Sequence, residues 1–235
     1  MPDEIDEMSH KRNNLCSHIL KDHFGELAQT AGSSLLKENV CALRYLAAKN
    51  KLPLEKVKKV LCVFLQHNIC KFKADERGVN EYIINSENIL RRSRFPKYIY
   101  CAKTLYGDAA ELVTEEILQN GKMMMSEVIQ NVTSKLNEAL VNAGHPEIAS
   151  CFVQEKFNCL VNTHFLQRCK LESGPEENLV EDFYKLPELG TRKRKHNSTD
   201  GSALTTKKRR ILDSPEREKP DDDDIYWRVN YERFH

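Results

Sequence analysis

Basic and aromatic side chains alternate in the segment Ile89–Gly107 (ILRRSRFPKYIYCAKTLYG), which contains no acidic residue. Basic side chains can contact phosphates, and aromatic rings interleaved with them can stack on bases. We therefore predict that the cations contact DNA or an acidic partner. The rings have an alternative role, because a helix that bridges two domains would bury its aromatic side chains in the seam. The basic residues are Arg91, Arg92, Arg94, Lys97 and Lys103, and the aromatic ones are Phe95, Tyr98, Tyr100 and Tyr106.

No motif in the sequence indicates enzymatic chemistry. A glycine-rich phosphate loop, an HExxH motif and a nucleophile elbow are all absent from it. The eight cysteines form no CxxC pair, so a zinc site is not expected. We predict no catalytic residue, no metal, no cofactor and no small-molecule substrate.

The composition allows a hydrophobic core and excludes a global polycation. Hydrophobic residues make up 40% of the chain and charged residues 30%, with a net charge of +1. Basic residues must therefore act as local clusters. No apolar run approaches the roughly 20 residues that span a bilayer, so no membrane partner is expected. The charged N-terminus lacks the apolar region of a signal peptide, and we interpret the cysteines as reduced side chains of an intracellular protein.

The elements that must position the basic segment begin with a helix that leads into a hairpin. Apolar residues of Leu54–His67 recur with the spacing of a helix that buries one face. Ile69–Ala74 then alternates apolar and polar residues, and Val79–Ile84 returns after a turn at Gly78, as in a β-hairpin. This order predicts a winged helix, which is a helix-turn-helix with an added hairpin. The two upstream helices are expected at Phe24–Glu38 and Val40–Lys49, with breaks at Gly32 and Asn39.

The second half of the chain repeats this order. Helical patterns at 108–120, 125–140 and 147–162 precede a strand-like segment at 163–169, so a second winged helix is predicted. Residues 171–224 have few large apolar side chains and are expected to form a disordered loop before a return strand. The predicted fold class is mainly α with small β-hairpins (α+β), arranged as tandem winged-helix domains. The boundaries are 1–14 for a disordered tail, 15–88 for the first domain, 89–107 for a connector helix, 108–170 for the second domain, 171–224 for the loop, and 225–235 for the return strand and the start of a further domain.

A helix that reads base edges usually presents Arg, Asn or Gln toward them, whereas the third helix of the first unit offers one Lys, one Gln and one Cys. The face of Leu54–His67 opposite its apolar stripe holds Glu55, Lys59, Cys62 and Gln66, and helix 147–162 is net acidic. We therefore predict protein docking with non-specific contact to the DNA backbone. Further contact candidates lie on the first unit's third helix and hairpin, and they are Lys58, Lys59, Lys71, Lys73 and Arg77.

Two basic clusters within 171–224 resemble a bipartite nuclear localisation signal. The alternative is a solvated charge run in a flexible loop. We predict a nuclear protein. The signal residues are Arg192, Lys193, Arg194, Lys195, Lys207, Lys208, Arg209 and Arg210.

Several runs of residues resemble one family, the winged-helix subunit specific to RNA polymerase III that is similar to the alpha subunit of TFIIE. They are VKKVLCVFLQHN, RGVNEY, LRRSRFPKYIYCAKTLYGDAAELVTEEILQNGK, RKRKHNS and IYWRVNYERFH. The resemblance implies tandem extended winged helices, then a coiled coil, in a non-catalytic component of the polymerase that makes tRNA, 5S rRNA and other small RNAs. It also implies a place on the polymerase clamp with two partner subunits, and a role in promoter opening near single-stranded DNA.

Compared with that family, the chain ends where a third winged helix would begin, so we expect a short isoform or an incomplete gene model. Two other functions stay open. A stand-alone winged-helix regulator would prefer one duplex sequence, and a pure scaffold would be indifferent to DNA at low salt.

Overall fold

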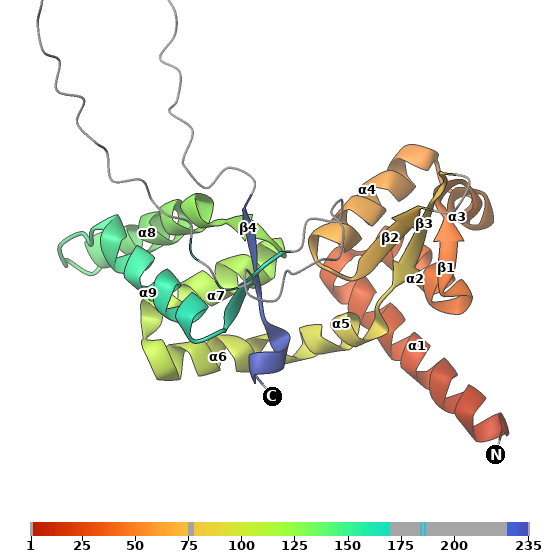
Figure 1. Ribbon diagram of the computed structural model, residues 1–235, viewed down its shortest axis with the longest axis horizontal. Coiled ribbons are helices and arrows are strands. Elements are labelled where there is room, and N and C mark those ends of the chain that lie inside the picture. The colour runs from red at the N-terminus through yellow and green to blue at the C-terminus, as the bar shows by residue number, and fades with distance from the viewer. Residues whose placement is uncertain (1, 75–77, 170–183, 185, 187–224, 235) are drawn as a thin grey trace, which may run out of the picture.

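The computed structural model describes residues 2–74, 78–169, 184, 186 and 225–234. Two units lie side by side along the long axis, each with its helices on one side of a small three-stranded sheet (Figure 1). A continuous helical segment runs along the bottom of the view and joins them. The mainly α architecture with two small antiparallel sheets confirms the predicted fold class.

The first unit is a winged helix. Its sheet has the strand order β1-β3-β2, and all pairs are antiparallel. Its elements are α1 (Pro2–Phe24), α2 (Glu26–Glu38), β1 (Val40–Ala42), α3 (Leu43–Asn50), α4 (Leu54–Gln66), β2 (Cys70–Ala74) and β3 (Asn80–Ile84). The third helix and the hairpin therefore lie where the apolar spacing predicted them.

The core of the first unit forms where α1, α2 and α4 meet. Leu20, Leu35 and Phe64 are fully buried there, and Gly32 lies between them inside α2. A Cβ on Gly32 would overlap Leu20 and come within 3.4 Å of Phe64 Cζ. Gly32 thus does not break the helix as predicted, because its missing side chain allows close helix packing.

Two further sequence predictions for this unit need correction. Residues 2–14 are helical as the first part of α1, where a disordered tail was predicted. Tertiary contacts account for the difference, since Arg12 pairs with Glu87 and the Asn13 amide donates to the Leu36 carbonyl. Residues 40–42 form strand β1 rather than the start of a helix, because they pair with β3 of the hairpin.

The second unit is also a winged helix, and it contains the last described residues. Its sheet has the strand order β4-β6-β5. The connecting and second-unit elements are α5 (Ser86–Arg91), η1 (Arg92–Arg94), α6 (Phe95–Tyr106), α7 (Asp108–Asn120), β4 (Met123–Met124), α8 (Met125–Asn142), α9 (Ser150–Asn162), β5 (Leu166–Arg168), β6 (Tyr226–Val229) and η3 (Tyr231–Phe234).

The predicted return strand is present. Strand β6 pairs with β5, with Leu166 opposite Val229, although 56 residues separate Arg168 from Ile225 in sequence and most of them lie outside the described ranges. Trp227 of β6 is fully buried and meets Phe157 of α9 edge to face, with ring centroids 5.5 Å apart. This burial explains how the short strand is held in the second core.

The predicted connector at 89–107 is divided between the two cores. Ile89 of α5 packs in the first core, whereas Phe95 and Tyr98 of α6 pack in the second. Phe234 of η3 lies on Tyr98, with ring centroids 4.7 Å apart, so residues 231–234 pack on the second unit. The start of a further domain within residues 225–235 stays a prediction.

Candidate nucleic-acid and partner interface

Arg92 is buried at the seam between the two units, with 6% of its surface exposed. Its guanidinium lies between the rings of Phe24 and Phe95, 4.5 and 4.9 Å from their centroids. Its Nη1 is 3.3 Å from Nδ1 of His67. The prediction that Arg92 contacts DNA or a partner is therefore wrong for this conformation, because the side chain is enclosed by aromatic rings.

The electrostatics of this seam follow from burial. Burial lowers the pKa of Arg92 to about 10, so the side chain remains charged at neutral pH. Burial, together with the charge of Arg92, lowers the pKa of His67 to about 4. Because Arg92 can only donate, Nδ1 of His67 must accept this bond as an unprotonated nitrogen. The neutral imidazole is thus the form that the seam requires.

The other connector cations differ in their surroundings. Arg94 and Lys97 are exposed. Lys103 is exposed but pairs with Asp108 at 3.3 Å and Glu111 at 2.7 Å, so its charge is already compensated. Of the aromatic side chains, Phe95 borders the seam through its contact with Arg92, whereas Tyr98 and Tyr106 pack within the second unit, on Phe234 and Phe165. Tyr100 is 69% exposed.

The other described basic residues predicted to contact DNA are also either paired with an acidic residue or exposed. Lys58 pairs with Glu55 at 2.9 Å, whereas Lys59, Lys71 and Lys73 are exposed. Arg77 and the two basic clusters at 192–195 and 207–210 lie outside the described residues.

A second part of the seam is made by main-chain groups. The side-chain amide of Gln66, at the end of α4, donates to the carbonyls of Asn120 and Lys122 at 3.0 and 2.7 Å. Between these two residues, Gly121 has a φ of +84°, and a Cβ there would lie 2.5 Å from the Gln66 carbonyl oxygen. Gln66 therefore joins the two units and is not free to contact bases.

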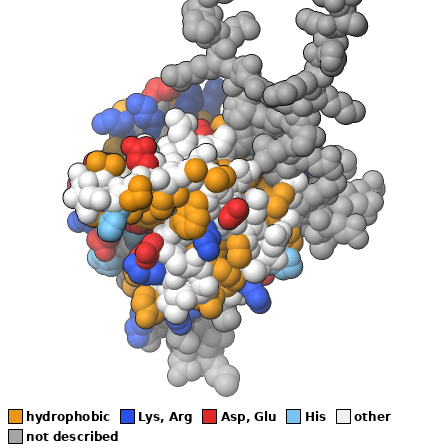
Figure 2. All heavy atoms as spheres, turned by 90° about the vertical axis from the view of Figure 1, so that its left-hand side faces the viewer, with side chains coloured by type: hydrophobic (Ala, Val, Ile, Leu, Met, Phe, Trp, Pro, Cys, Tyr) orange, Lys and Arg blue, Asp and Glu red, His pale blue; other side chains and the backbone are white. Residues whose placement is uncertain are grey.

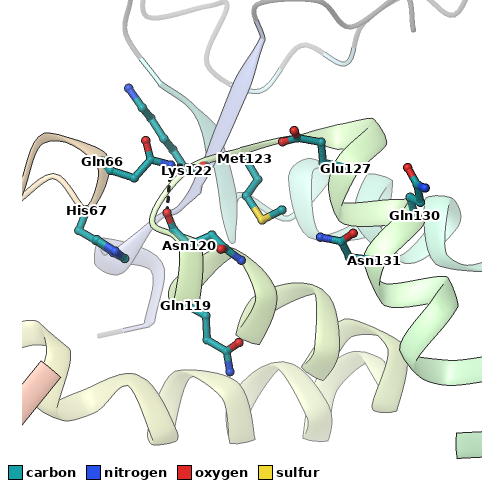
Figure 3. A pocket seen from close by; sticks show the side chains of 9 residues that line it. All are labelled: Gln66, His67, Gln119, Asn120, Lys122, Met123, Glu127, Gln130 and Asn131. Carbon is teal, nitrogen blue, oxygen red and sulfur yellow. Dashed lines mark hydrogen bonds between the residues drawn. The ribbon is translucent and has the colours of Figure 1, made fainter. Parts of the chain in front are cut away.

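Beside this junction lies a polar pocket of about 570 Å³ between α4, α7 and α8 (Figure 3). The Gln66 amide reaches across its edge toward the turn that holds Asn120 and Lys122. Its lining consists almost entirely of amide, imidazole and charged side chains. Nothing in the lining resembles a catalytic arrangement, and the pocket marks the meeting of the two units.

A groove lies between the two wings and brings together cations from four elements. Lys71 of β2 and Arg91 of α5 line one wall of the groove. The facing wall carries Lys122, from the turn between α7 and β4, and Arg228 of β6. Two adjoining cavities of about 280 and 430 Å³ form it, and both contact Asn68, Lys71 and Arg228. Sequence reasoning missed Lys122 and Arg228, because only the pairing of β6 brings Arg228 to this place.

The opposite end of the molecule has a different surface. Figure 2 shows hydrophobic, acidic and basic side chains intermixed at the end of the second unit that carries α8 and α9. Val141 is 56% exposed there and Phe152 is 38% exposed, with Lys156 over the Phe152 ring.

In the part of the chain that the structure describes, no three or more His, Cys, Asp or Glu side chains are grouped so that they could hold a metal ion. Among the described helices, none has both the length and the apolar character needed to cross a bilayer. No disulfide joins any of the eight cysteines, all of which lie within the described ranges.

The fold and the seam define the chain as a tandem winged-helix protein. Residues 14–75 match the family described as the RNA polymerase III subunit RPC82 helix-turn-helix domain. The DNA-directed RNA polymerase III subunit RPC3 of Rattus norvegicus is 38% identical over 97% of this chain and 45% of its own length, and that of Danio rerio is 39% identical over 97% and 46%. The subunit of Neurospora crassa is 27% identical over 57% of this chain and 22% of its own.

These similarities confirm the resemblance to the RNA polymerase III winged-helix subunit, and the chain is a homologue of RPC3. The chain spans about half the length of the curated relatives it matches.

Proposed function

We propose that the chain acts as a non-catalytic subunit of RNA polymerase III, which docks on other polymerase subunits through its winged helices. The observation that carries this proposal is the 36–39% identity to RPC3 subunits over 97% of the chain, which includes both winged-helix units. The polymerase clamp and two further initiation subunits are the expected partners, as the family resemblance implies.

The outward face of α4 supports docking rather than base reading. Leu54 and Val63 are 38% and 37% exposed, Cys62 is exposed beside them, and Lys58 is paired with Glu55. Such a surface offers few groups for hydrogen bonds to base edges. It suits a protein partner that covers exposed apolar side chains.

Contact with DNA would be non-specific and made through the phosphate backbone. The exposed cations Arg94, Lys97, Lys71 and Lys73 carry this part of the proposal. Contacts to phosphates position a protein without reading sequence. They suit a subunit that assists initiation and promoter opening on tRNA, 5S rRNA and other small RNA genes.

Action in the nucleus follows from the proposed function. The two basic clusters at 192–195 and 207–210 would direct import. Replacement of all eight basic residues by Gln in a fluorescent fusion should shift the protein to the cytoplasm. The control is the same eight-residue variant with an added viral import signal, which should return to the nucleus.

Docking is tested by affinity purification of the tagged chain from nuclear extract, with mass spectrometry of what is bound. Recovery of RNA polymerase III subunits with the wild-type chain, and their loss with Val63→Asp, would support docking through α4. The matched variant Lys37→Asp changes an exposed residue of α2 and should retain the subunits. Recovery of the tagged chain alone, together with selection of one duplex sequence, would favour the stand-alone regulator instead.

A further inference from the structure

The groove between the two wings has cationic side chains on both walls. Lys71 and Arg91 belong to the first unit and its connecting helix, whereas Lys122 and Arg228 belong to the second unit. Glu232 is the one acidic side chain among the residues that line the two cavities. The groove therefore has a net charge of +3, since four cations face one carboxylate.

None of these four cations forms an ion pair within the described part of the chain. Neutral neighbours orient three of them instead. Arg91 donates to the Asn88 amide oxygen at 3.3 Å, and Lys122 lies over the Tyr226 ring, 5.5 Å from its centroid. The oxygen of Gln167, with its amide turned toward Arg228, accepts from Nε and Nη2 at 3.0 and 3.2 Å.

This arrangement leaves positive charge without an internal counterion in a concave site. Cations on facing walls repel one another, and the repulsion is relieved when an anion lies between them. The seam holds the two walls in place, since Gln66 links α4 to the turn that carries Lys122. The site is thus formed before a ligand arrives, which lowers the cost of binding.

The shape of the groove favours a single strand over a duplex. Its adjoining cavities of about 280 and 430 Å³ are of a size for individual nucleotide units. A duplex is read by convex elements that enter its grooves, whereas single strands lie in positively charged grooves with aromatic side chains beside them. The amides of Asn68 and Gln167 line the cavities and can form hydrogen bonds with a strand, and the partly exposed ring of Tyr226 lies beside the groove under Lys122.

We propose that the groove between the two wings binds the phosphodiester backbone of a single nucleic-acid strand, with Lys71, Arg91, Lys122 and Arg228 as the phosphate contacts. This inference rests on the proposed function, which includes non-specific DNA contact, and assigns that contact to one site. It differs from the sequence prediction because the second unit supplies half of the charge. The exposed connector cations Arg94 and Lys97 lie outside this lining.

Binding of the full chain to a fluorescent oligothymidylate about 12 nucleotides long would test the site. The double variant Lys122→Gln/Arg228→Gln should weaken binding about fivefold and lower the slope of log affinity against log salt by about 1.4, at roughly 0.7 per phosphate contact. The matched control Lys37→Gln/Lys56→Gln removes two exposed charges that do not line the groove, and it should leave the slope unchanged.

The outcomes separate the groove from the general proposal. If Arg94→Gln/Lys97→Gln weakens binding and the groove variant does not, the groove proposal is overturned while non-specific DNA contact stands. If the wild-type chain binds no single strand at low salt but binds a labelled oligoglutamate, the groove takes an acidic protein segment and the proposal is overturned. Equal affinity for a duplex of the same sequence would also contradict it.

Discussion

The guanidinium of Arg92 lies 4.5 Å from the centroid of the Phe24 ring, so a connector side chain is held by the last residue of the first helix. On its other side, Phe95 of α6 is 4.9 Å away. Arg92 thus links the two winged-helix units instead of presenting its charge to a ligand. The wing-to-wing groove depends on this seam, because the seam determines how its two walls face each other.

Arg92→Ala should lower the free energy of unfolding by about 3 kcal/mol, since a desolvated cation–π contact and a hydrogen bond are lost together. Urea denaturation followed by circular dichroism measures this change. Arg94→Ala removes an exposed arginine two residues away and should cost less than about 1 kcal/mol. Equal effects of the two substitutions would show that Arg92 is not held as described.

Gly121→Ala should destabilise the contact between the units. Its Cβ would lie 2.5 Å from the Gln66 carbonyl oxygen, at a backbone φ of +84°. Gly144 is a matched control, because it also has a positive φ of +76° but no atom within 4 Å of an added Cβ. Gly121→Ala and Gly144→Ala share a conformational cost of about 1 kcal/mol, because both positions have a positive φ. A larger loss of unfolding free energy for Gly121→Ala, measured by thermal unfolding, therefore reports the clash between the two units.

Stability should fall as the pH is lowered from about 6.5 to about 4. In this window the unfolded chain protonates His67 near its ordinary pKa, whereas burial and the charge of Arg92 hold the folded pKa at about 4. The unfolded state therefore binds more protons, and the free energy of unfolding decreases by roughly 2 kcal/mol after allowance for partial solvent screening. Above about pH 6.5, His67 is neutral in both states, so its contribution to the free energy of unfolding is fully present and no longer changes with pH.

His67→Asn tests the origin of that pH dependence. An Asn oxygen can accept the bond from Arg92 but does not titrate, so the variant should have a flatter profile of unfolding temperature against pH. His23 faces the same arginine, and burial together with that charge also lowers its pKa. A His23→Gln variant therefore measures how much His23 contributes to the pH dependence of stability. If neither substitution changes the profile, the pH dependence does not come from these histidines.

The exposed connector cations should contribute to DNA affinity where the compensated one does not. Arg94→Gln/Lys97→Gln should reduce the salt dependence of oligothymidylate binding if both contact phosphates, at roughly 0.7 per contact. Lys103→Gln should have little effect, because Asp108 and Glu111 already neutralise Lys103. Fluorescence anisotropy at several salt concentrations distinguishes the two cases.

Local pattern was enough to predict most helices and both wings. The apolar spacing of Leu54–His67 and the alternation of Ile69–Ala74 depend only on neighbouring residues. The helix and the strand that they predict are therefore present as α4 and β2. The return strand at Ile225–Val229 was also predicted, because its apolar residues stand out beside a polar segment. The three-residue strand β1 was missed, since its conformation depends on pairing with β3.

The sequence by itself determined which residues are charged and where they lie along the chain. The tertiary structure decided whether each charge is buried, paired or exposed. Arg92 and Arg94 are two residues apart and equal in sequence terms, yet one is buried against Phe24 and the other is exposed. Arg228 gained its place beside Lys71 only through the pairing of distant strands. The physical reason is that burial and electrostatic environment depend on contacts between residues far apart in the chain, which local spacing does not encode.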